Sequence, residues 1–142
     1  MSDDSSSPVA HTKHGDLTLD QLAEIQPGMA RLMVEVSDRF WILYYAAKEG
    51  NWELARHEFS EMRKTMQIAG VVRPKYQEPL AGFIAEKLKP LEDAIRAKDR
   101  PAFEKAFYET KDAANEMHQE FGYQYIVWQL PNAPPPHLRL AP

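Results

Sequence analysis

Apolar side chains recur at alternating intervals of three and four residues through the middle of this 142-residue chain. The set is Trp52, Ala55, Phe59, Met62, Met66 and Ala69. On a helix this spacing places every member on one narrow face, the kind of seam that a neighbouring helix covers. Gly50 and Asn51 come just before the seam and are suited to end one helix and to cap the next. A joint this short predicts that the two helices pack antiparallel.

The segments on either side of this helix have the same periodicity. The preceding helix should span about residues 28–49. Its inner face should consist of Met29, Leu32, Met33, Val36, Phe40, Leu43, Tyr44 and Ala47. It also carries a second apolar stripe. The stripe consists of Val34, Trp41, Ile42 and Tyr45. Gly70 is expected to end the seam helix, and a third helix should follow over about residues 77–98. Pro90 predicts a kink or break in it near residues 86–90, because an interior proline loses a backbone hydrogen bond and clashes with the preceding turn.

Two further signals complete the helical pattern. Asp99 is suited to cap a fourth long helix, and Gly122 to end it. Thr18 and Gln21 have the spacing of a capping box, which predicts a short helix over about residues 18–26. Four long helices with short joints, and no strand that finds a partner, predict an all-α fold. The expected architecture is an up-down-up-down four-helix bundle with a short N-terminal helix and an extended, Pro-rich C-terminal tail.

The two ends of the chain differ in composition from the helices. Residues 1–16 are polar and rich in Ser and Asp, and we expect them to be disordered. Residues 17–142 should form the bundle domain, with the tail beginning at residue 123. Several prolines keep that tail extended. It should lie along the outside of the bundle and bury Tyr125, Val127 or Trp128 in a groove.

Composition excludes several classes of function. The chain has no cysteine, which rules out disulfides, thiolate metal sites and thioether-linked haem. Its net charge of −4 gives no electrostatic reason to expect a nucleic-acid partner. No apolar run is long enough to span a membrane. The first residues lack the basic and apolar regions of a signal peptide, so we expect a cytoplasmic protein.

His118 is the side chain with the most chemical potential. It borders the inner face of the fourth helix, where it could be a hydrogen-bonded boundary residue, an axial ligand or a proton carrier. Glu53 and His57 are four residues apart, but His57 points away from the seam, so we interpret them as a solvated pair. The sequence predicts no metal site.

A longer set of residues resembles a known group of proteins. The segments are residues 40–55 (Phe-Trp-Ile-Leu-Tyr-Tyr-Ala-Ala-Lys-Glu-Gly-Asn-Trp-Glu-Leu-Ala), Arg73-Pro74, residues 94–99, Asn115, His118, Gly122-Tyr123, Leu130-Pro131 and Pro134-Pro135. Together they resemble small bacterial helical-bundle proteins that carry Cys-Asn-x-Cys-His near the C-terminus and are similar to periplasmic mono-haem c-type cytochromes.

The resemblance implies positions for a haem site that this chain cannot complete. The two cysteines of the motif fall on Ala114 and Met117, and the haem-ligating histidine falls on His118. The chain would then be a haem-less relative whose interior is either repacked or vacant. The resemblance leaves non-covalent haem open, since one histidine can hold it, but we expect no cofactor.

These observations lead to one functional hypothesis and two alternatives. We expect a non-catalytic protein that binds a small apolar or aromatic molecule between its helices. Its ligand-binding residues should be His118, Met117, Ala114, Phe107, Phe121, Met62, Met66, Phe40 and Tyr44. The first alternative is a small enzyme that uses His118 as acid or base in the former haem cavity. The second is an interaction module that forms a homodimer through the second stripe of residues 28–49.

Overall fold

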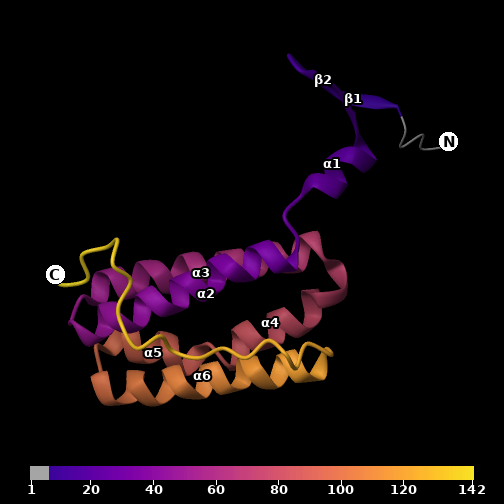
Figure 1. Ribbon diagram of the computed structural model, residues 1–142. Coiled ribbons are helices and arrows are strands. Elements are labelled where there is room, and N and C mark those ends of the chain that lie inside the picture. The colour runs from indigo at the N-terminus through magenta and orange to yellow at the C-terminus, as the bar shows by residue number, and fades with distance from the viewer. Residues whose placement is uncertain (1–6) are drawn as a thin grey trace.

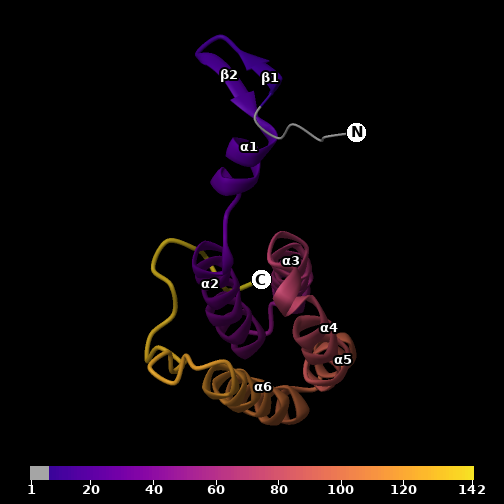
Figure 2. The same ribbon diagram turned by 90° about the vertical axis from the view of Figure 1, so that its right-hand side faces the viewer.

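The computed structural model describes residues 7–142, which are mainly helical, as expected (Figure 1). In chain order the elements are β1 (Pro8–Thr12), β2 (Gly15–Thr18), α1 (Leu19–Ile25), α2 (Met29–Lys48), α3 (Trp52–Val72), the 3-10 helix η1 (Pro74–Tyr76), α4 (Gln77–Glu86), α5 (Lys89–Ala97) and α6 (Arg100–Glu120). Helices α2 to α6 lie together and form what we call the helical body, whereas β1, β2 and α1 project from one end of it (Figures 1 and 2). In the part of the chain that is described, no helix is both long and apolar enough to cross a bilayer.

Helices α2 and α3 pack side by side as the antiparallel pair that the short joint predicts. Gly50 has a φ of 80°, in the left-handed region that glycine enters without steric cost. The Asn51 side chain caps α3 by accepting a hydrogen bond from the Leu54 N–H at 3.2 Å. The predicted seam faces inward: Trp52 is partly covered, and its other five residues are buried.

The third predicted helix is divided in two, as Pro90 predicts. Helix α4 ends at Glu86 and α5 begins at Lys89, which puts Pro90 in a first turn, where its missing N–H costs nothing. The prediction for Gly70 is wrong, because α3 continues to Val72. Gly70 is instead buried at a close approach, where an added Cβ would lie 3.2 Å from the Cα of Gln77.

The N-terminal residues depart from the expected disorder. β1 pairs antiparallel with β2 from Pro8 to Thr18, so the prediction is wrong for residues 8–16, while residues 1–6 lie outside the described part. Backbone pairing and local contacts, such as the 2.7 Å contact between His11 and Asp16, hold this hairpin without a core. The predicted capping box then starts α1, but α1 buries none of its residues. The polar composition correctly indicates a segment without a core, and it misses the local pairing.

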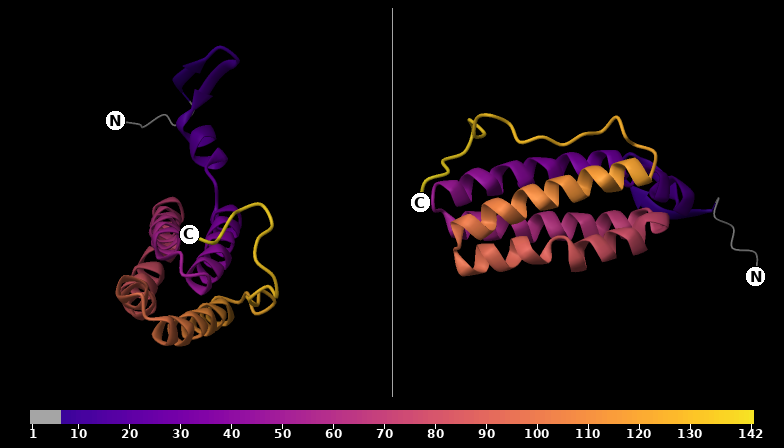
Figure 3. Two further views of the ribbon diagram at one scale, coloured as in Figure 1. Left: turned by 90° about the vertical axis from the view of Figure 1, so that its left-hand side faces the viewer. Right: turned by 90° about the horizontal axis from the view of Figure 1, so that it is seen from below.

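The C-terminal tail, residues 123–142, runs beside α2 and α6 (Figure 3). Trp128 is partly buried against the core, whereas Tyr125 and Val127 are 75% and 66% exposed. Of the three residues that the sequence offered as anchors, Trp128 is therefore the one that packs. The hydroxyl of Tyr45 donates to the Pro131 carbonyl at 2.6 Å, and the indole of Trp41 donates to that of Ala133 at 2.9 Å.

The tail binds to two residues of the second apolar stripe of α2, Trp41 and Tyr45. Tyr45 and Ile42 are buried and Trp41 is partly covered, whereas Val34 is 62% exposed. A dimer contact through the whole stripe would therefore require the tail to move away first.

Candidate ligand-binding cleft

Six of the nine residues expected to bind a ligand come together around one interior hollow. They are Phe40 from α2, Met62 and Met66 from α3, and Ala114, Met117 and His118 from α6. The volume of this hollow is about 40 Å³, close to the roughly 30 Å³ that one water molecule occupies in the liquid. Pockets that bury small organic ligands measure about 300–1,000 Å³, so this hollow is too small to enclose one.

Two more of the expected residues fill the interior beside this hollow. Phe107 is fully buried and stacks on Phe40, with ring centroids 4.1 Å apart and planes 10° apart. The Tyr44 ring packs against Phe107 at 4.7 Å, and its hydroxyl donates to Glu104 at 2.7 Å. Burial, followed by that hydrogen bond, raises the pKa of Tyr44, so its phenol stays protonated near neutral pH. These rings are part of the packed core, and they leave no space for a ligand between them.

The cytochrome resemblance raises the question of whether this interior fits a haem. Ala114 and Met117 cannot form thioether bonds, and the stacked rings and small hollow leave no porphyrin-sized space. In the described residues, no group of three or more His, Cys, Asp or Glu side chains is placed to hold a metal ion. The interior hollow, of about 40 Å³, therefore has no room for a porphyrin.

His118 lies in the last turn of α6 and is partly buried. Its Nδ1 is 2.9 Å from the Ile126 carbonyl oxygen, and its ring meets that of Trp128 edge to face at 5.8 Å. A carbonyl can only accept a hydrogen bond, so Nδ1 carries the hydrogen and Nε2 of the neutral ring keeps its lone pair. His118 thus holds the tail with one nitrogen and keeps the other as an acceptor.

Outside the packed interior, His118 forms part of the wall of a much larger open cleft. This cleft, which we call the His118 cleft, has a volume of about 520 Å³. We call the segment between α3 and α4, residues 73–76, the connector. The residues that line the cleft are Met29, Ala30, Met33, Val34 and Ser37 of α2, Arg73, Lys75 and Tyr76 of the connector, His118 of α6, and Tyr123, Ile126 and Trp128 of the tail. Phe121, the ninth expected residue, lines an adjoining hollow of about 90 Å³ that shares Met29, Met33 and Tyr76 with the cleft.

The cleft combines apolar walls with positive charge. Arg73 and Lys75 line it, and none of the Asp and Glu residues among residues 7–142 does. Arg73 is held at the end of α3, where its Nη1 donates to the Val72 carbonyl at 2.7 Å. A Cβ added at Gly28 would lie 2.6 Å from Nη2 of Arg73, so the absence of a side chain at residue 28 makes room for the guanidinium. The Lys75 ammonium lies 4.9 Å from the centre of the Tyr76 ring, within the range of a cation–π contact.

Two tyrosines join the connector to the tail at the rim of this cleft. The hydroxyls of Tyr76 and Tyr123 are 3.4 Å apart. That contact, and then the neighbouring Lys75 ammonium, lowers the pKa of Tyr76, and the same contact raises the pKa of Tyr123. The pair therefore links two segments that are 47 residues apart in the sequence.

Another hollow, separate from the His118 cleft and of about 360 Å³, lies under the tail between α2 and α6. Phe40 and Phe107 contribute to its wall, together with the tail residues from Val127 to Pro131. Asp38 and Lys111, of opposite charge, also line it. It is smaller than the His118 cleft and does not include His118, so it is the weaker candidate for a binding site.

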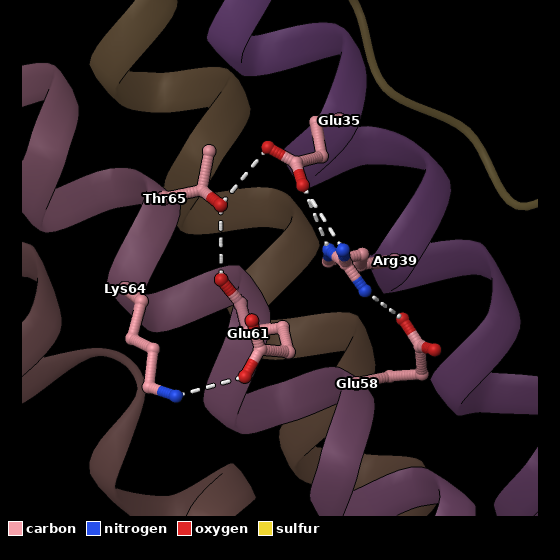
Figure 4. A network of polar contacts seen from close by, with 6 residues as sticks. All are labelled: Glu35, Arg39, Glu58, Glu61, Lys64 and Thr65. Carbon is pink, nitrogen blue, oxygen red and sulfur yellow. Dashed lines mark hydrogen bonds and ion pairs between the residues drawn. The ribbon is translucent and has the colours of Figure 1, made fainter.

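A polar network joins α2 to α3 away from the cleft (Figure 4). Arg39 donates to Glu35 on its own helix at 3.0 Å and to Glu58 on α3 at 2.9 Å, and the Thr65 hydroxyl donates to Glu35 at 3.0 Å. Burial alone would lower the pKa of Arg39, but its hydrogen bonds to the two carboxylates outweigh that effect and raise it. With its charges paired in this way, the network is a structural contact between the helices.

The remaining sequence candidates are on the surface. Glu53 and His57 are exposed, in agreement with the predicted solvated pair, and they line an open polar groove of about 490 Å³ over α3 and α5. Comparison of the chain with protein-family models, with curated proteins and with solved structures found no match.

Of the residues that line the His118 cleft, His118 is the one that the sequence predicts as ligand-binding. Met29 and Met33 fall on the predicted inner face of α2, and that spacing is a signal for them. Arg73, Tyr76 and Tyr123 reach the cleft through the path of the connector and the tail, which no local pattern predicts.

Proposed function

We propose that this protein binds a small apolar or aromatic molecule in the His118 cleft without transforming it. The observation that supports the proposal most is the cleft itself, a hollow of about 520 Å³ with methionine and aromatic walls. That volume lies within the roughly 300–1,000 Å³ usual for small-molecule sites. Methionine side chains are flexible and polarisable, so Met29 and Met33 can adapt to ligands of irregular shape.

The proposal includes the finer architecture expected from the sequence. In it, α2, α3, the α4–α5 pair and α6 are the four members of an up-down-up-down bundle, and the Pro-rich tail is an extended strap. The ligand then sits at one end of the bundle, where α2 begins and α6 ends, and not between the helices. The proposal keeps the expected cytoplasmic location.

The enzyme alternative has one observation in its favour. The bond from Nδ1 of His118 to the Ile126 carbonyl leaves Nε2 as an acceptor, as a general base requires. However, no Asp or Glu in the described part of the chain lines the cleft to act with it. Binding without catalysis therefore explains the described residues with fewer requirements.

A fluorescent probe and two variants, each with one alanine replaced by tryptophan, test the proposed site. N-phenyl-1-naphthylamine is neutral and apolar, and its emission rises when it leaves water. Ala30 is exposed and lines the cleft, so Ala30→Trp should fill the cleft and weaken probe binding by at least about tenfold, the loss of roughly 1.4 kcal/mol. Ala81 is equally exposed on α4 and does not line the cleft, so Ala81→Trp should leave the affinity unchanged. An equal effect of the two substitutions, or no binding to the wild type, would rule out this site.

A further inference from the structure

We propose that the natural ligand of the His118 cleft is an amphipathic acid, with an apolar or aromatic body and one anionic group held by Arg73 and Lys75. This inference rests on the proposed function and adds the chemical class of its ligand. The shared chemistry is a carboxylate or a related anion attached to an apolar group.

The first argument is the charge of the lining. The chain as a whole is acidic, with 21 Asp and Glu residues against 17 Lys and Arg residues. The cleft has the opposite character, since it is lined by Arg73 and Lys75 and by no carboxylate. Within residues 7–142, no Asp or Glu oxygen lies within 4.0 Å of the charged nitrogens of these two side chains. Arg73 and Lys75 therefore form no ion pair with a described carboxylate.

The second argument is that the two cations are held in place before any ligand arrives. Arg73 is partly buried, and its bond to the Val72 carbonyl uses one of the N–H donors of the guanidinium. The space beside Gly28 fixes the side on which the guanidinium lies. Lys75 is tethered over the Tyr76 ring. A guanidinium that keeps N–H donors beyond this one bond is suited to a planar anion such as a carboxylate.

The third argument is the apolar surface beside the cations. Met33 and Val34 of α2 face the same cleft as Ile126 and Trp128 of the tail. An inorganic anion would leave these side chains in contact with water, and a neutral apolar molecule would leave the cations without a partner. A single molecule with both characters satisfies the two parts of the cleft at once.

Two probes that differ in one group test this inference. 1-Anilinonaphthalene-8-sulfonate carries the ring system of N-phenyl-1-naphthylamine together with an anionic sulfonate. Replacing both cations, in Arg73→Gln with Lys75→Gln, should weaken binding of the sulfonate probe on the order of tenfold. The neutral probe should bind the wild type and this variant within about twofold of each other. The control Arg100→Gln with Lys105→Gln removes the same charge from exposed positions at the start of α6 and should change neither affinity.

Salt and phosphate provide two measurements that need no folded variant. Affinity for the sulfonate probe should fall as sodium chloride is raised from low to high concentration, while affinity for the neutral probe should not, because salt screens exposed charges. Inorganic phosphate should displace no more probe than sodium chloride at equal ionic strength. Strong displacement by phosphate would mean that the cleft takes inorganic anions, and it would overturn the inference.

The outcomes separate this inference from the proposed function. If Ala30→Trp abolishes binding of the neutral probe while the cation substitutions affect both probes equally or neither, the cleft binds apolar molecules and the acid-binding inference is wrong. If the neutral probe does not bind the wild type, the proposed function fails and this inference fails with it.

Discussion

Arg39 lies between two carboxylates, one on its own helix and one on the next. Its partner Glu58 is only 6% exposed, so that carboxylate depends on Arg39 for its charge partner. Removing one member of a buried ion pair costs about 3–5 kcal/mol, because the other charge is left uncompensated. The i, i+4 spacing of Glu35 and Arg39 is visible in the sequence, but it indicates only a surface pair. The contact with Glu58 depends on how α2 and α3 pack.

We therefore expect Arg39→Met to lower the free energy of unfolding by about 3 kcal/mol. The matched control is Arg96→Met, since Arg96 also pairs with a glutamate but is 72% exposed, and it should cost less than about 1 kcal/mol. Urea denaturation followed by circular dichroism measures both. A loss for Arg39→Met no larger than that of the control would mean that Glu58 does not need its partner.

Single residues also show how much of the candidate site the sequence predicts. Helical spacing correctly places Met62, Ala114 and His118 around one interior hollow, because the inner face of a helix follows from its period. The same spacing cannot tell lining from filling: Tyr44 proves to be packed core, and Phe107 packs against it and also contributes to the wall of the hollow under the tail. Whether an inner-face ring borders an empty space depends on the partner that it meets across the interface.

Among the elements, the helices follow directly from the sequence and the hairpin does not. The seam, the caps at Asn51 and Asp99 and the break at Pro90 are local signals, and each appears where it was expected. The β1–β2 hairpin buries little and has no strong apolar alternation, so its pattern resembles that of a disordered segment. Helix α3 passes the expected end at Gly70 and continues to Val72, and Gly70 instead lies at a close approach to Gln77.

The tail is the element whose attachment is easiest to test. The Asn115 side chain accepts from the Trp128 N–H at 2.7 Å and donates to the Trp128 carbonyl at 3.0 Å, and His118 bonds to Ile126. Asn115 and His118 thus both hold the tail to α6. Asn115→Ala leaves the Trp128 backbone groups without these partners, which should cost about 1–3 kcal/mol.

This loss should lower the melting temperature by roughly 3–8 °C for a domain of this size. Asn132→Ala, at an exposed asparagine of the same tail, is the control and should melt with the wild type. Equal melting temperatures for both variants would show that the tail adds nothing to the stability of the helical body.

At the scale of the whole molecule, the His118 cleft is formed by segments that are far apart in the sequence. The start of α2, the connector around Arg73, the end of α6 and the tail all meet at one end of the helical body. Sequence periodicity predicts helices and their inner faces, but the cleft depends on where a connector and a tail pass. For that reason the expected site lay between the helices, whereas the His118 cleft lies at their end.

The methionines allow the central claim, that a small apolar ligand binds in the His118 cleft, to be tested directly. Met29 lines the cleft and not the interior hollow, Met62 and Met66 line the hollow and not the cleft, and Met33 lies between the two and lines both. With ¹³C-labelled methionine methyl groups, each of the six methionines of the chain should give its own NMR signal. Adding N-phenyl-1-naphthylamine should shift the signals of Met29 and Met33 and leave those of Met62 and Met66 in place. Shifts of Met62 and Met66 without a shift of Met29 would place the ligand between the helices and contradict the account.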